Sequence, residues 1–145
     1  MQILVDADAC PVKQIIVRLA KQRNIPVTML IDTSHELNDG YSRIITVDKH
    51  TDSVDYALMG LLTREDIVVT QDFGLAAMVI GKGAKAVSQN GLIFTDANMD
   101  KLLLERHIGQ KIRRGGGRAK GPSKRTKDDD ARFEAAFEGL LADIE

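Results

Sequence analysis

Residues 1–19 read MQILVDADACPVKQIIVRL, and this stretch decides the fold class. The apolar run that ends at Asp6 predicts a buried strand over residues 2–6. Pro11 suits the first turn of a following helix, where its missing N–H costs no hydrogen bond. Four apolar residues then recur at the i, i+3, i+4, i+7 spacing of an amphipathic helix: Val12, Ile15, Ile16 and Leu19. The stretch therefore predicts a strand that leads directly into a helix.

The same alternation of strands and helices continues to residue 110. Further strands are expected at residues 27–31, 44–47, 66–70, 84–88 and 92–94, and helices at 53–63, 75–79 and 99–108. Residues 32–42, rich in Asp, Ser, Asn and Gly, predict a loop. Strands that alternate with helices favour an α/β fold with a largely parallel sheet covered on both faces.

Length and composition are those of one ordinary globular domain with a tail. The chain has 145 residues, of which 43% are hydrophobic and 28% charged, with a formal net charge of -1. No apolar run is long enough to cross a bilayer, and Met1 is not followed by the pattern of a secretory signal. Cys10, the only cysteine, cannot form an internal disulfide, so we expect a cytoplasmic protein.

Charge is strongly segregated near the end of the sequence, which suggests three parts: a domain over 1–110, a flexible basic linker over 111–127 and a helix over 128–145. The linker bases, with no acid among them, are Lys111, Arg113, Arg114, Arg118, Lys120, Lys124, Arg125 and Lys127. They are candidate contacts to nucleic-acid phosphates, and a solvated linker is the alternative. The apolar face of the final helix must dock on the chain's own body or, in a homodimer, on a second subunit.

Aspartates gather where the predicted strands end. Asp6 and Asp8 end the first strand, Asp52 and Asp55 begin the helix after the third strand, and Asp72 follows the fourth. Each has a simple structural explanation, because aspartate is a favoured helix N-cap and stabilises the first turn. All of them nevertheless fall at one edge of a parallel sheet, where ligands bind in such folds.

A cluster of carboxylates at this edge predicts a site for Mg²⁺ or Mn²⁺, since both prefer oxygen ligands. One ion, or two about 4 Å apart, could activate water against a phosphodiester. Thr70 and Lys13 could orient a ligand or meet a phosphate, and Ser34 and His35 lie in a loop at the same edge. Asp96 is expected to cap the last helix of the domain.

Three segments resemble the signature segments of the YaiI/YqxD family of small bacterial proteins, which is grouped with PIN-like nuclease domains. They are VDADACPVK at 5–13, DSVDYAL at 52–58 and VVTQDFGLA at 68–76, and the tail adds Gly121, Pro122, Asp130, Arg132 and Phe133. The resemblance implies a PIN-like three-layer α/β/α sandwich whose acidic site binds a divalent metal. It also implies that the metal ligands and catalytic residues are Asp6, Asp8, Asp55 and Asp72.

The leading functional hypothesis is a metal-dependent nuclease, with RNA as the favoured substrate. Asp-Ala-Asp at the end of a first strand also resembles haloacid-dehalogenase-like phosphatases, in which Asp6 would be the nucleophile and Asp8 the acid/base partner. A third hypothesis is an RNA-binding module without catalysis. Cys10 is expected to be structural, and His35, His50 and His107 show no metal-ligand spacing.

Overall fold

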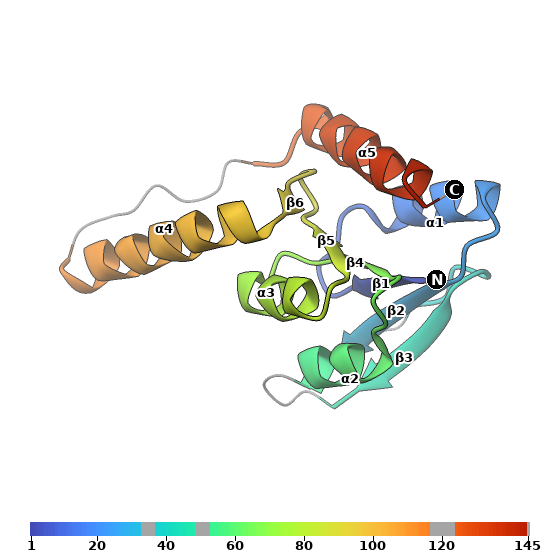
Figure 1. Cartoon of the computed structure of the whole chain (residues 1–145), viewed down its shortest axis with the longest axis horizontal. Helices are drawn as coiled ribbons and strands as arrows, with labels where there is room; N and C mark the ends of the chain where they lie inside the picture. Colours follow the sequence, from blue (N-terminus) through green and yellow to red (C-terminus); the bar gives the residue numbers. More distant parts are fainter. Residues whose placement is uncertain (33–36, 49–52, 117–123, 145) are drawn as a thin grey trace.

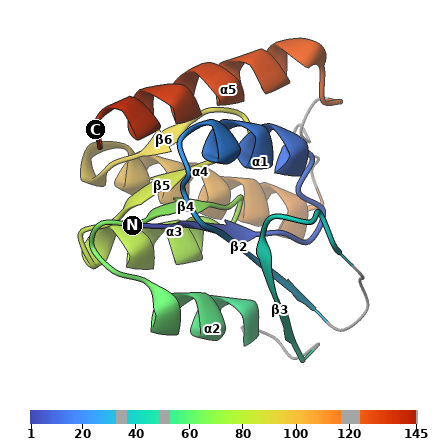
Figure 2. The same ribbon diagram turned by 90° about the vertical axis from the view of Figure 1, so that its right-hand side faces the viewer.

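The sheet contains six strands in the order β3-β2-β1-β4-β5-β6 (Figures 1 and 2). The computed structural model describes residues 1–32, 37–48, 53–116 and 124–144. The elements in chain order are β1 (Ile3–Asp6), α1 (Lys13–Gln22), β2 (Val27–Asp32), β3 (Arg43–Val47), α2 (Ser53–Leu61), β4 (Ile67–Val69), α3 (Phe73–Gly81), β5 (Lys85–Val87), β6 (Ile93–Phe94), α4 (Asp96–Arg114) and α5 (Lys127–Ala142). Strands β1 to β5 run parallel, and β6 is antiparallel to β5.

Helices cover both faces of the sheet, so the molecule is a three-layer α/β/α sandwich. Helices α1 and α5 lie on one face, and α2 and α3 lie on the other (Figure 2). Side chains of β1 alternate between these layers: Ile3 and Val5 join the core under α1 and α5, whereas Leu4 joins the core over α2 and α3. Burial on both faces explains the continuous apolar runs of the central strands β1 and β4. The predicted fold class is confirmed.

The apolar face of α5 packs on the chain's own body. Phe133 and Phe137 are fully buried, their rings stack at 5.2 Å, and both belong to the core under α1. An ion pair between Arg18 of α1 and Glu134 of α5 ties the two helices together at the surface. The helix begins with a capping box, in which the Thr126 hydroxyl accepts from the Asp129 N–H and the Asp129 carboxylate accepts from the Thr126 N–H. Of the two docking alternatives, the structure shows the intramolecular one.

Helix α4 is longer than predicted. It runs from Asp96 to Arg114, so residues 111–114 of the expected linker are helical, and part of the expected linker, 117–123, lies outside the described residues. Gly109 directly follows the predicted helix end at residue 108, but one glycine inside a helix costs only about 1 kcal/mol and is tolerated. The first turn is capped by Thr95, whose hydroxyl accepts from the Asn98 N–H at 3.2 Å, and the expectation that Asp96 is the cap is wrong. None of the described helices is long and apolar enough to span a bilayer.

Candidate functional site

The candidate site lies where the strand order of the sheet reverses. The chain moves outward from β1 to β2 in one direction, and outward from β4 to β5 in the other, so β1 and β4 are central neighbours. Asp6 is the last residue of β1, and Thr70 follows β4 directly. Ligands of open parallel sheets bind at this point, beyond the carboxyl ends of the two central strands.

Thr70 connects two of the predicted carboxylates. Its side chain is fully buried, and its hydroxyl donates to Asp6 Oδ2 at 3.0 Å. The Thr70 hydroxyl oxygen in turn accepts a hydrogen bond from the backbone N–H of Asp72, also at 3.0 Å. A buried hydroxyl with both bonds made fixes the groups that it joins. Thr70 therefore holds the Asp6 carboxylate and the start of the loop to α3 in one arrangement.

Asp72 serves as the N-cap of α3 and also lines a cavity. Its Oδ1 accepts from the Leu75 N–H at 3.2 Å, as the capping explanation predicted. The cavity has a volume of about 420 Å³ and is lined by Asp6, Gln71, Asp72, Phe73 and Arg106. Asp72 can do both, because the second carboxylate oxygen of an N-cap is not used by the cap.

Negative charge is concentrated around Asp6. Burial of the side chain is the largest cause that raises its pKa above the usual value, and the charges of Asp72 and Asp8 raise it further. The hydrogen bond from Thr70 acts in the opposite direction by stabilising the charged form. Because a bound cation would relieve both the desolvation and the repulsion, the site is suited to a positive ligand.

Asp8 fixes the end of the neighbouring strand. Its Oδ2 accepts a hydrogen bond from the backbone N–H of Asp32, the last residue of β2, at 3.1 Å. The N-cap of α1 is Val12, with no side-chain capping bond, so the interpretation of Asp8 as a helix cap is wrong. The chain turns between β1 and α1 through Ala9, which has a left-handed φ of 54°. Pro11 precedes the helix by two residues rather than lying in its first turn.

Cys10 and Lys13 lie beside the site without lining the cavity. The Cys10 thiol is buried, and this burial raises its pKa, although the charges of Lys13 and Arg125 partly oppose the shift. A protonated, buried thiol fits the structural role expected for this residue. Lys13 donates from Nζ to the Ala7 carbonyl at 3.3 Å, which holds the turn after β1.

The other predicted site residues do not line the cavity or lie outside the described residues. Asp55 lies in the first turn of α2, the helix that follows β3 at the same edge of the sheet. Ser34, His35, His50 and Asp52 fall outside the described residues. Within the described part of the chain, no group of three or more His, Cys, Asp or Glu side chains is spaced to hold a metal ion by itself. His107 is exposed on α4.

Sequence reasoning missed three residues of the cavity: Gln71, Phe73 and Arg106. Gln71 and Phe73 flank Asp72 in the sequence, and the position of Asp72 could have drawn attention to them. Arg106 comes from α4 and reaches the site because α4 packs beside α3. No local signal marks Arg106, since its role depends on how two helices pack.

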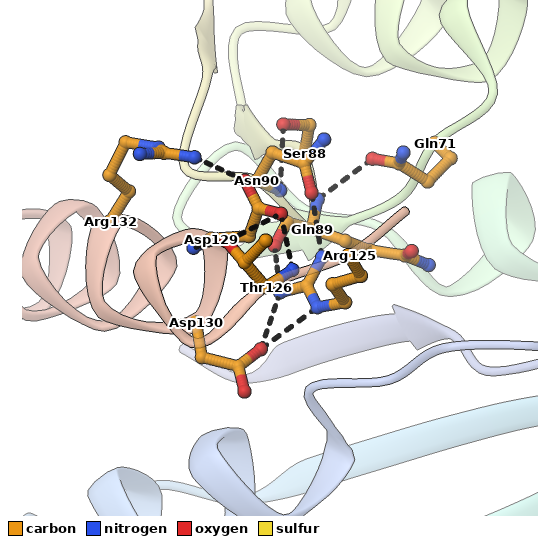
Figure 3. A network of polar contacts seen from close by, with 9 residues as sticks. All are labelled: Gln71, Ser88, Gln89, Asn90, Arg125, Thr126, Asp129, Asp130 and Arg132. Atoms are coloured by element: carbon orange, nitrogen blue, oxygen red, sulfur yellow. Dashed lines mark hydrogen bonds and ion pairs between the residues drawn. The ribbon is translucent and has the colours of Figure 1, made fainter. Parts of the chain in front are cut away.

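Arg125 belongs to a structural network rather than to an open basic surface (Figure 3). Its guanidinium donates to the Asn90 side chain at 2.6 Å, to the Gln89 carbonyl at 2.8 Å and to Asp130 at 2.8 Å. The backbone N–H of Gln89 in turn donates to the side chain of Gln71 at 2.8 Å. Arg125 therefore links the start of α5 to the loop after β5, and through that loop to the rim of the candidate site.

The remaining bases of the expected linker are placed in part. Those with exposed side chains are Lys111, Arg114, Lys124 and Lys127. Arg113 lies on α4, and Arg118 and Lys120 fall outside the described residues.

Comparison with known proteins gives the family. A family model described as "Uncharacterized BCR, YaiI/YqxD family" matches residues 4–143. The chain belongs to this family. Among the relatives of this YaiI/YqxD chain, a protein named "UPF0178 protein" from Ruminiclostridium cellulolyticum is 66% identical over 137 residues, covering 94% of this chain and 90% of the relative.

Two further relatives carry the same printed name. The one from Lachnoclostridium phytofermentans is 54% identical and covers 99% of both chains, and the one from Exiguobacterium sibiricum is 46% identical and covers 99% of this chain and 98% of the relative. No solved structure matches the chain. The resemblance to the YaiI/YqxD family is thus confirmed, and its grouping with PIN-like domains stays a prediction.

Proposed function

We propose that this YaiI/YqxD chain is a divalent-metal-dependent nuclease that hydrolyses phosphodiester bonds, with RNA as the favoured substrate. One observation carries the proposal: Asp6 and Asp72, from the ends of neighbouring central strands, line the same cavity as Arg106. Carboxylates can hold a divalent cation, and an arginine beside them can contact the phosphate that the cation activates. The family resemblance suggests nucleic acid as the substrate.

The residues of the cavity fit one Mg²⁺ or Mn²⁺ ion. Such ions are commonly bound by one or two carboxylates, with water and substrate phosphate as the other ligands. Asp6 and Asp72 would be these ligands. The pKa of Asp6 is raised because its charged form is buried and repelled by neighbouring carboxylates, and a cation would stabilise that charged form. Asp8 and Asp55 are secondary candidates, since the charge of Asp8 also raises the pKa of Asp6 and Asp55 lies in the first turn of α2 at the same edge.

When bound, the ion supplies an activated water and stabilises the leaving oxygen. The protein's own groups would position the substrate around it. Thr70 holds the Asp6 carboxylate through its hydroxyl, and its bond to the Asp72 N–H fixes the loop that carries the second ligand. Arg106 offers a planar guanidinium that can contact two phosphate oxygens at once. Phe73 supplies an apolar wall to the same cavity.

The test uses Asp6→Asn and Asp72→Asn in the full chain. Both variants remove a charge while the amide oxygen can still accept the bonds from Thr70 and Leu75, and asparagine caps helices as well as aspartate does. We expect each variant to lose at least about 100-fold in Mn²⁺ affinity, measured by calorimetry, and in cleavage of end-labelled single-stranded RNA. Asp143→Asn, at an exposed carboxylate beyond α5, is the matched control and should change neither. Unchanged Mn²⁺ affinity in both site variants would contradict the proposal.

The alternatives give different outcomes in the same experiments. Turnover of p-nitrophenyl phosphate without RNA cleavage would favour the phosphatase, with Asp6 as nucleophile. RNA binding that never leads to cleavage would favour the binding module. Deletion of the tail cannot test this module, because it would remove α5 from the core and break the Arg125 network. Replacement of the four exposed bases Lys111, Arg114, Lys124 and Lys127 by glutamine tests it without that damage.

A further inference from the structure

Helix α4 exposes a stripe of apolar side chains. Leu104, Ile108 and Ile112 are 57%, 47% and 44% exposed. Their spacing of four residues places them on one face of the helix, and we call them the α4 stripe. Met99 and Leu102 pack instead against the core over α3. A continuous apolar stripe that the described part of the chain leaves uncovered marks an interaction surface.

The position of α4 makes this stripe accessible to another molecule. Figure 1 shows α4 extending outward beyond the edge of the sheet, away from α1 and α2. The helix has 19 residues, which corresponds to a length of about 28 Å. A second helix of the same length could therefore lie along the whole stripe.

The charges of α4 indicate which partner fits. Its first half, 96–105, carries three acids, Asp96, Asp100 and Glu105, and one base, Lys101. Its second half, 106–114, carries four bases and no acid. Two α4 helices paired antiparallel about Ile108 would place Glu105 of each copy opposite Lys111 of the other, which brings unlike charges together. A parallel pair would place like charges together, which is unfavourable.

We propose that the α4 stripe is the contact surface for a second copy of this chain, paired antiparallel through a two-fold axis near Ile108. Ile108 is the middle residue of the stripe, so an axis there brings Leu104 of one copy opposite Ile112 of the other and buries all three residues of both copies. A two-fold axis makes the contact self-complementary, as in most homodimers. This interface is independent of the proposed nuclease site, and it differs from the α5 face, which is buried within the chain.

The first experiment measures oligomeric state by analytical ultracentrifugation over a concentration series. The unmodified chain should form a dimer, and Ile108→Glu should raise the dissociation constant by at least about tenfold, since the pair would bury unpaired carboxylates. Tyr56→Ser is the matched control: Tyr56 is 86% exposed on α2, and its loss should leave the dimer unchanged. Circular dichroism checks that the variants fold. A chain that stays monomeric throughout, or a dimer that Ile108→Glu leaves intact, overturns the proposal.

The second experiment tests orientation by oxidative cross-linking. Antiparallel pairing predicts that Ile108→Cys cross-links with itself, that Leu104→Cys and Ile112→Cys each fail alone, and that a mixture of these two cross-links. A parallel pair would cross-link all three variants separately. The unmodified chain is the control, because Cys10 is buried and should not react. If the stripe instead binds RNA, Ile108→Glu will weaken RNA binding in a chain that never dimerises, which also overturns the proposal.

Discussion

At the scale of single residues, the site depends on a carboxylate that the fold makes difficult to ionise. Asp6 is held by Thr70 and surrounded by burial and by two like charges, so its pKa is raised in the folded state. A carboxylate with a raised folded-state pKa stabilises the protein below its unfolded pKa, and that contribution is lost as the pH rises through the folded value. At neutral pH and without metal, ionised Asp6 therefore destabilises the fold.

We expect Asp6→Asn to increase the stability of the metal-free protein at pH 7, on the order of 1 kcal/mol, the usual size of a stabilising substitution. The gain should shrink as the pH is lowered through the raised pKa of Asp6 towards 3.8, because the native side chain then becomes neutral as well. Urea denaturation at several pH values measures both effects. Asp66→Asn is the control and should lower the stability. Asp66 is buried, and its two carboxylate oxygens accept from the N–H groups of Gln2 and Thr63. Asparagine has only one side-chain oxygen and cannot replace both bonds. A loss of stability in Asp6→Asn at pH 7 would contradict the expectation.

The sequence predicted the acidic side of the site better than the basic side. Asp6 ends one apolar strand and Asp72 follows another. The apolar pattern shows where each strand ends, and the carboxyl ends of parallel strands lie at the same edge of the sheet. Arg106 lies in the middle of α4, and its contact with the cavity depends on how α4 packs against α3. The roles of Thr70 and Asp8 in holding neighbouring backbone also depend on contacts between residues distant in the sequence.

At the scale of elements, α5 depends on close contact with the turn after β5. Gly91 in this turn has a φ of 87°, and a Cβ built on it would lie 2.5 Å from the Arg132 carbonyl oxygen of α5. Arg125 also donates hydrogen bonds to this turn, to the side chain of Asn90 and to the carbonyl of Gln89. A single glycine thus lets the helix approach the sheet edge, where the arginine then fastens it.

We expect Gly91→Ala to destabilise the protein by at least about 3 kcal/mol, because it combines backbone strain with a clash against rigid backbone. Gly40→Ala separates the two causes: Gly40 has a similar φ of 75°, but no atom lies within 4 Å of its added Cβ. It should cost only about 1 kcal/mol, the strain alone. Thermal unfolding of both variants gives the comparison, and equal losses would show that the contact with α5 does not matter.

The predicted element boundaries agree with the structure where a clear helix cap marks the end of an element. The start of α5 at Lys127 agrees with the predicted helix because Thr126 and Asp129 form a capping box. The end of α4 differs from the predicted end at residue 108, because the helix continues through Gly109 to Arg114. One glycine did not end the helix, because it costs only about 1 kcal/mol and extending an existing helix is easier than starting one.

At the scale of the whole molecule, α5 is part of the domain and not an appendage. Phe133, Phe137 and Leu141 are fully buried in the core that β1 and α1 share. We expect a chain that ends at residue 123 to lose cooperative unfolding and to bind a hydrophobic dye, because this face of the core becomes exposed. A chain that ends at Ala142 retains α5 and should unfold like the full chain. Cooperative unfolding of the shorter chain, measured by circular dichroism and calorimetry, would show that residues 1–123 fold alone.

The late position of α5 also has a consequence for biosynthesis. Strands β1 to β5 are complete in the nascent chain well before residues 127–142 leave the ribosome, so one face of the growing sheet has only α1 to cover it. Exposed apolar surface of this kind is what chaperones bind and what drives aggregation of folding intermediates. Conditions that pause translation between α4 and α5 should therefore increase the chaperone dependence of this protein, whereas a pause after Ala142 should not.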